Sequence, residues 1–214
     1  VSLRDDPEGV FQSFPPSPID LAVVLNNFHR LGVRHAATAA VLAWESPDVI
    51  GLAALDKAMN RFDSLVMSAP LSRSAVPEMM PASFRKASIP LSNIHGAITE
   101  LPIVNRIPLP GIILGGENTM AGFQTLDSEP DSGRFPIIAR WADRAVLAFP
   151  LLVAMQRLNL PIQGIQVRLG EYIKLGPDGP FIPIDRDGSL GYSPPRMRAF
   201  AEIPATSLID GGDG

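Results

Sequence analysis

The chain has 214 residues, no cysteine, 46% hydrophobic residues and a formal net charge of −4. This length suits one large or two small domains, and the apolar fraction excludes a disordered tail protein. The lack of cysteine excludes disulfides, a thiol nucleophile and cysteine-ligated metals. Because acidic residues slightly outnumber basic ones, we expect no nucleic-acid partner.

No stretch of the sequence has the length and apolarity of a membrane span. The longest strongly apolar run without a charge, residues 145–156, has 12 residues, whereas a spanning helix needs about 18–20. The chain begins at Val1 and carries no leader pattern at its start. We therefore expect it to meet a membrane only through segments outside this chain.

The first helix is the clearest local signal in the sequence. Residues 1–16 lack periodicity and are predicted to form an extended arm. Ser17, Pro18 and Asp20 then combine an N-cap, a proline at the first helical position and a carboxylate three residues after the cap. Apolar residues follow at helical spacing until Gly32, which suits a left-handed helix end.

The next elements alternate between strand and helix. Residues 35–44 are short and almost uncharged, which predicts a strand buried on both faces. Ser46-Pro47-Asp48 starts a second helix with an apolar face, and residues 65–69 are a further short apolar run. This order is typical of parallel strands joined by helical crossovers.

The remainder is divided into an irregular middle and a β-rich C-terminal half. Six prolines interrupt residues 72–116, where we expect only a short helix over residues 78–86. Pro150 is predicted to open a helix, and Asp187-Gly188 is a strong hairpin-turn signal. The fold class is therefore α/β, with a largely parallel central sheet flanked by helices and hairpins in the C-terminal half. The expected strands there are residues 120–125, 135–141, 144–149, 165–169, 172–175, 181–184, 190–192 and 197–203.

Three histidines are the candidates for nucleophilic catalysis. His29 lies in the first helix, His35 starts a core strand and His95 lies in the irregular middle. No Gly-x-Ser-x-Gly elbow exists, although a serine–histidine pair is recognised by geometry and not by sequence order. Surface or structural roles are the favoured interpretation of all three.

Glycine-rich segments give no phosphate-binding signal. Residues 111–116 and 164–170 match neither the dinucleotide-binding fingerprint nor a Walker loop. Turns and bulges account for these glycines.

Acidic motifs give only weak metal or glycosidase signals. Asp185-x-Asp187-Gly188 resembles the start of a calcium loop, but the closing position is Arg196. A turn is therefore favoured over a metal site, and we expect no metal and no cofactor. Glu129 with Asp131, or Asp185 with Asp187, would be carboxylate pairs for glycoside hydrolysis, but solvated loop charge is the favoured interpretation of both pairs.

Residues 121–137 are the most informative segment. They predict a strand, a Pro-Asp-x-Gly turn and a returning strand that begins basic and becomes apolar. Gly133 supplies the conformation that the turn needs, and Asp131 can bond to its own backbone. Arg134 could then pair with Asp131 or Asp127, or bind an anionic ligand with two hydrogen bonds.

This segment resembles the CHASE2 domain family. The likeness is carried by Gly122-Phe123 followed by Pro130-Asp131-x-Gly133-Arg134-x-Pro136, by a helix start at residues 148–154, and by a closing hairpin at residues 182–192. It covers residues 17–192, more weakly toward the start. Gly133 and Arg134 are one residue closer than in the family pattern, and the aspartate of the family's first strand is missing, Glu45 being the nearest acid. The chain is therefore similar to a distant member.

The resemblance implies the sensory part of a bacterial transmembrane signalling receptor. CHASE2 domains lie outside the cytoplasm and bind a signal without catalysis. The implied organisation is an arm at residues 1–16, one sensor domain at 17–204 and a flexible tail at 205–214. We expect an unidentified small-molecule ligand at the carboxyl edge of the parallel strands, with Asn118 and Arg134 as ligand-binding residues. A homodimer is compatible with this interpretation.

Two other classes of function remain open. One is an exported α/β hydrolase-like enzyme in which a serine, His95 and a carboxylate meet in space. The other is a non-catalytic interaction module of a cell-envelope assembly. Catalytic geometry would favour the first of these, and a large exposed apolar patch would favour the second.

Overall fold

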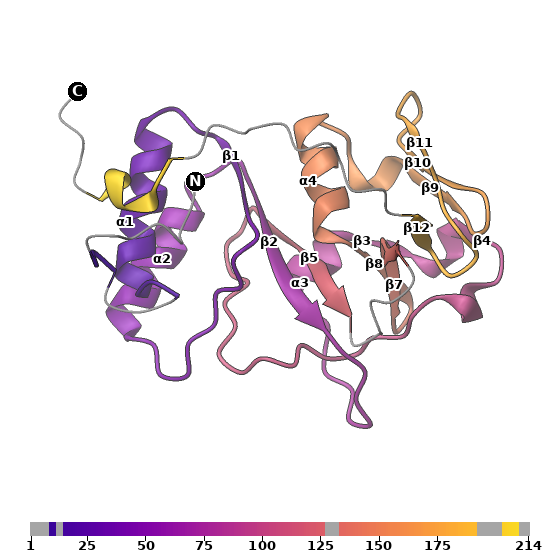
Figure 1. Cartoon of the computed structure of the whole chain (residues 1–214), viewed down its shortest axis with the longest axis horizontal. Helices are drawn as coiled ribbons and strands as arrows, with labels where there is room; N and C mark the ends of the chain where they lie inside the picture. Colours follow the sequence, from indigo (N-terminus) through magenta and orange to yellow (C-terminus); the bar gives the residue numbers. More distant parts are fainter. Residues whose placement is uncertain (1–8, 12–14, 127–132, 192–202, 210–214) are drawn as a thin grey trace.

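The computed structural model describes residues 9–11, 15–126, 133–191 and 203–209. Two helices lie at one end of the molecule, a parallel sheet lies beside them, and small sheets with hairpins form the other end (Figure 1). The predicted mixed α/β class is confirmed at this level.

The two helices at this end start at the predicted caps. In α1 (Pro18–Arg30), the Ser17 hydroxyl oxygen accepts a hydrogen bond from the Asp20 amide at 3.2 Å. Gly32 follows the helix with a φ of 89°, as its position predicted. Asp48 caps α2 (Val49–Met59) by accepting from the Gly51 amide at 2.7 Å.

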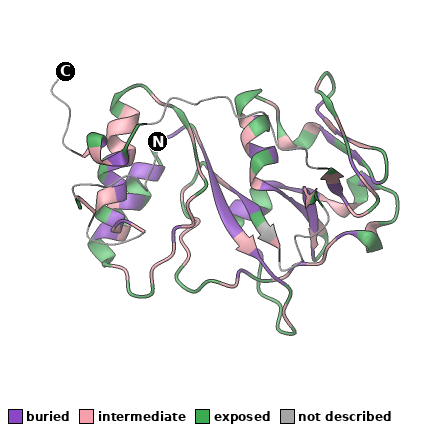
Figure 2. Ribbon diagram, in the orientation of Figure 1, coloured by how far each residue is buried: buried purple, intermediate pink, exposed green. Residues whose placement is uncertain are grey.

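The parallel sheet has three strands in the order β1-β2-β5. Its bounds are β1 (His35–Thr38), β2 (Ser64–Leu71) and β5 (Thr119–Leu126). The expectation of a first strand buried on both faces is wrong, because β1 is a short edge strand that alternates between exposed and half-buried residues. β2 is the central, buried strand instead (Figure 2).

Helices cover both faces of this sheet. Leu65 and Met67 pack with residues of α1 and α2 in one apolar cluster. On the other face, Gly122 lies against α4 (Phe149–Arg157), where a Cβ atom would be 2.7 Å from the Phe149 backbone. The Gln156 amide of α4 donates to carbonyl oxygens of both β1 and β2 at 3.2 and 3.1 Å, so α4 bridges the two strands.

The proline-rich middle is more ordered than its sequence predicted. The short helix α3 begins at Ala82 because Pro81 occupies its N-cap position. Phe84 of this helix is completely buried and lies 5.9 Å from the Trp141 ring. The other elements of this segment are β3 (Ser88–Pro90), η1 (Leu91–Asn93), β4 (Ile94–His95) and η2 (Ile98–Glu100).

The C-terminal half forms three small sheets, β3-β8-β7, β11-β10-β9-β4 and β12-β6. The antiparallel pairs β7–β8, β9–β10 and β10–β11 are the hairpins that were expected in the C-terminal half. The bounds are β6 (Arg134–Pro136), β7 (Ile138–Trp141), β8 (Arg144–Leu147), η3 (Ile162–Gly164), β9 (Ile165–Arg168), β10 (Tyr172–Leu175), β11 (Phe181–Pro183) and β12 (Ser189–Gly191).

Two expectations about these strands need correction. The single strand expected over residues 135–141 is divided between β6 and β7, which pair with different sheets. The turn at Asp187-Gly188 is present, with Gly188 at a φ of 74°, but it does not join a hairpin because β12 pairs with β6 and not with β11. The strand expected over 197–203 falls, apart from Ile203, outside the described residues.

A small third apolar cluster is formed between α1 and the last described residues. Val24 packs there with Ala205 and Leu208 of η4 (Ala205–Leu208), and Phe11 and Phe28 pack against them. Ala205 and Leu208, which belong to the expected flexible tail, are therefore buried beside α1 (Figure 1).

Candidate functional site

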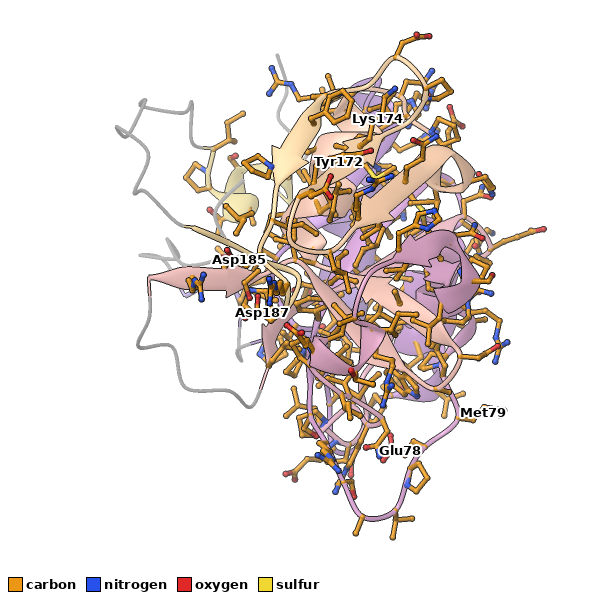
Figure 3. The ribbon with its side chains drawn as sticks, turned by 90° about the vertical axis from the view of Figure 1, so that its right-hand side faces the viewer. Glu78, Met79, Tyr172, Lys174, Asp185 and Asp187 are labelled. Atoms are coloured by element: carbon orange, nitrogen blue, oxygen red, sulfur yellow. The ribbon has the colours of Figure 1, made fainter. Side chains whose placement is uncertain are left out.

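The exposed face of the sheet β11-β10-β9-β4 gathers polar and aromatic side chains from four strands. Strand pairing places His95 beside Arg168, Arg168 beside Tyr172, and Tyr172 beside Pro183 in one row. A second row runs from Gln166 through Lys174 to Phe181. Figure 3 views the molecule from this side, with Tyr172 and Lys174 together on β10.

Alternation along the strands produces this face. In β9, Ile165 and Val167 are buried while Gln166 and Arg168 are exposed. β10 follows the same period of two, with Ile173 and Leu175 buried. The apolar side chains anchor the sheet on the core, so the polar side chains are directed outward from a fixed backbone.

A hollow of about 560 Å³ lies on this face. Its volume falls within the range of small-molecule sites. Arg168 and His95 supply its basic groups, and Tyr172 supplies a ring and a hydroxyl group. Amides and a hydroxyl add hydrogen-bonding groups from Asn93, Gln163, Gln166 and Ser92.

Arg168 remains available to a ligand. Among the described residues, its one ion pair is with Glu171, at 3.7 Å between two side chains that are more than half exposed. Exposed pairs of this kind contribute little because solvent screens them. A carboxylate or phosphate could therefore displace Glu171 and bind the guanidinium group with two hydrogen bonds.

The aromatic side chains beside the hollow support one another. The Tyr172 and Phe181 rings meet edge to face with 4.9 Å between centroids. The Lys174 ammonium lies 5.2 Å from the Phe181 centroid. Tyr172 is thus held in place from the β11 side.

The structure places the two predicted ligand residues elsewhere. Asn118 directly precedes β5, so it lies at the amino end of the parallel strands and not at the expected carboxyl edge. Its amide donates to the Phe62 carbonyl oxygen at 3.2 Å, which ties the start of β5 to the turn that follows α2. Arg134 starts β6 and forms an ion pair with Asp185 at 2.6 Å. The two predicted residues have different partners and do not share the hollow.

The Arg134–Asp185 pair is accessible to solvent, with 48% and 43% of the two side chains exposed. We expect Arg134→Ala to lower the free energy of unfolding by about 1 kcal/mol or less, since solvent-exposed pairs are weak. Chemical denaturation measures this change. A loss well above 1 kcal/mol would show that Arg134 does more than pair with Asp185.

The acidic motif at residues 185–188 is a turn in the structure. The Ser189 amide donates to the Asp187 side chain at 3.0 Å, and the Gly188 amide donates to the Asp185 carbonyl oxygen at 3.0 Å. Figure 3 shows Asp185 and Asp187 apart from Tyr172 and Lys174. Over the described ranges, no group of three histidine or acidic side chains is arranged to hold a metal ion.

Of the three predicted histidines, only His95 lines the hollow. Ser92 lines it too, but the Ser92 hydroxyl contacts Asn93 at 3.4 Å. His29 contacts Arg34 and packs edge to face on Phe62. His35 lies at the edge strand β1. Within the part of the chain that the structure describes, no histidine ring is hydrogen-bonded to a serine.

Comparisons with protein-family models, curated proteins and solved structures found no match to this chain. Within the described residues, none of the helices is both long enough and apolar enough to span a bilayer.

Sequence reasoning missed Arg168, Tyr172 and Gln166 as site residues. The signal was present in the alternation of residues 165–168 and 172–175, which predicts that every second side chain is exposed. The sequence does not reveal that β4, β9 and β10 pair with one another.

Proposed function

We propose that this chain is a non-catalytic, extracytoplasmic ligand-binding domain of a bacterial transmembrane signalling receptor. The row formed by His95, Arg168 and Tyr172 beside the hollow carries the proposal. The likeness to CHASE2 domains at residues 122–136 and 182–192 supports the receptor context. At the level of fold, a helix-covered parallel sheet followed by a β-rich half is compatible with it.

The chemistry of the hollow favours a small anionic molecule that also carries hydroxyl groups. Arg168 would hold a carboxylate or phosphate, because its planar donors match the geometry of these groups. The side-chain amides of Gln163 and Gln166 would bind hydroxyl groups, and the Tyr172 ring would cover an apolar sugar face. Phosphorylated and carboxylated sugars combine these features.

Glucose 6-phosphate and glucuronate are suitable probes, and glucose is the uncharged comparison. We expect the charged sugars to raise the melting temperature and to bind more tightly than glucose. Arg168→Ala removes a charge-assisted hydrogen bond worth about 1.5–3 kcal/mol, so the affinity for both charged probes should fall by about tenfold or more. Isothermal titration calorimetry measures the affinities.

Arg157→Ala is the matched control, because Arg157 is exposed on α4 outside the hollow. It should leave the affinity unchanged. Equal loss with both variants would mean that net charge, and not this site, attracts the probes. Equal binding of glucose and glucose 6-phosphate would contradict the anionic ligand class.

The receptor context has its own test in the full gene product. Transmembrane helices on both sides of this segment support a sensory domain in a receptor. A full-length product that is found free in the cytosol would contradict the extracytoplasmic proposal.

A further inference from the structure

A second cavity, of about 290 Å³ and partly open to solvent, lies between α1 and the sheet face that α1 covers. Small-molecule sites are concave, mostly apolar and have volumes from about 300 Å³ upward. A cavity of this size is therefore a candidate ligand site. Apolar side chains from α1, α2 and β2 line most of it, chiefly Leu21, Leu25, Phe28, Met59, Leu65 and Met67.

The lining selects an uncharged molecule. None of the described residues that line the cavity is aspartate, glutamate, lysine or arginine, and the polar side chains are His35 and Thr38 of β1. Burying a charge there would leave it without a partner, which is costly. Thr38 and His35 offer one hydrogen-bonding edge at most.

The volume of the cavity limits the size of the occupant. Met59, Leu65 and Met67 are only 1–2% exposed and form its floor. The volume is roughly twice that of an apolar cavity of about 150 Å³ that binds benzene. A single fused ring pair, such as naphthalene or indole, matches this volume.

We propose that the cavity beneath α1 binds a small, uncharged aromatic or aliphatic molecule of about this size. The site is separate from the polar hollow and shares no lining residue with it. The inference therefore does not depend on the proposed function of the hollow.

Binding in the cavity is coupled to residues near both ends of the chain, because two lining residues also pack against those residues. Val24 and Phe28 line the cavity and also belong to the cluster that holds Ala205, Leu208 and Phe11. The Asn27 amide in α1 donates to the Leu208 carbonyl oxygen. A ligand that supports α1 from below therefore stabilises the state in which η4 is docked on it.

Thermal denaturation and calorimetry with indole and naphthalene test the site. Both probes should raise the melting temperature of the full chain. Ala36 lines the cavity and pairs with Leu65, so Ala36→Leu places a larger side chain in the space. This variant should weaken both probes by about tenfold or more, whereas Ala53→Leu, on the exposed side of α2, should bind them like the original chain.

A second variant covers the case in which Ala36→Leu fails to fold. Leu25→Ala enlarges the cavity from the half-buried side of α1, and it should bind naphthalene more tightly relative to indole. Lack of binding by the original chain up to the solubility limit of both probes would overturn the proposal. Undiminished binding by Ala36→Leu, or an unchanged preference in Leu25→Ala, would do so too.

Hydrogen exchange tests the coupling to η4. The amides of Ser207 and Ile209 donate within this turn, and naphthalene should slow their exchange in the original chain but not in Ala36→Leu. Exchange that is unaffected by bound naphthalene would overturn the coupling. Since Arg168→Ala does not touch this cavity, it should leave naphthalene binding intact whatever it does at the hollow.

Discussion

Gly122→Ala is expected to lower the free energy of unfolding by about 3 kcal/mol, at the upper end of the range for overpacked cores. The added Cβ would lie 2.7 Å from both the nitrogen and the Cα atom of Phe149. These are backbone atoms at the start of α4, so no side-chain rotation can relieve the contact. β5 and α4 would have to separate. Urea denaturation followed by circular dichroism measures the loss.

Gly191→Ala is the matched control for this substitution. A Cβ at Gly191 meets no atom within 4 Å, although Gly191 is also a strand residue. We expect its free energy of unfolding to stay within about 0.5 kcal/mol of the original value. A Gly122→Ala variant as stable as this control would contradict the close approach of β5 to α4.

Phe84→Ala should cost about 3–5 kcal/mol, which is typical of truncating a buried phenylalanine. Phe84 is 0% exposed and contributes to the main apolar cluster. The helix that carries it has five residues and is too short to be stable without such packing. The loss should also change the fluorescence of Trp141, whose ring is 5.9 Å away.

Met79→Ala provides the comparison for Phe84→Ala. Met79 lies shortly before α3 and is 88% exposed (Figure 3), so its truncation removes little buried surface. We expect a change below about 0.5 kcal/mol. If Phe84→Ala were equally mild and left the Trp141 emission unchanged, α3 could not be anchored in the core as described.

Local chemistry made the helices predictable. Ser17 and Asp48 cap their helices with side-chain oxygens, and such signals depend only on neighbouring residues. The position of Pro81 was not used in this way. Helical spacing alone predicts a helix from residue 78, whereas α3 begins at Ala82, directly after Pro81.

The sheets were less predictable because strand partners are distant in sequence. A short apolar run such as residues 35–38 is compatible with a central or an edge strand, and only the neighbours decide between them. In the same way, the turn at Gly188 suggested a hairpin, but Leu190 of β12 pairs with Phe135 of β6. Long-range pairing of this kind leaves no local mark.

The candidate sites differ in how far sequence could have revealed them. The alternation of apolar and polar residues could have marked Arg168 and Tyr172 as outward-facing. Only the structure shows that they lie beside His95. The cavity beneath α1 could not have been foreseen. Its residues have the same apolar pattern as a filled core, and incomplete packing leaves no trace in a sequence.

The central claim is that the hollow beside Arg168 and Tyr172 recognises an anionic sugar and leaves it chemically intact. The most direct measurement is a titration of the protein with glucose 6-phosphate, followed by mass spectrometry of the sugar after prolonged incubation. The account predicts saturable binding at one site and full recovery of unchanged glucose 6-phosphate. Release of phosphate, or binding that Arg168→Ala does not weaken, would contradict it.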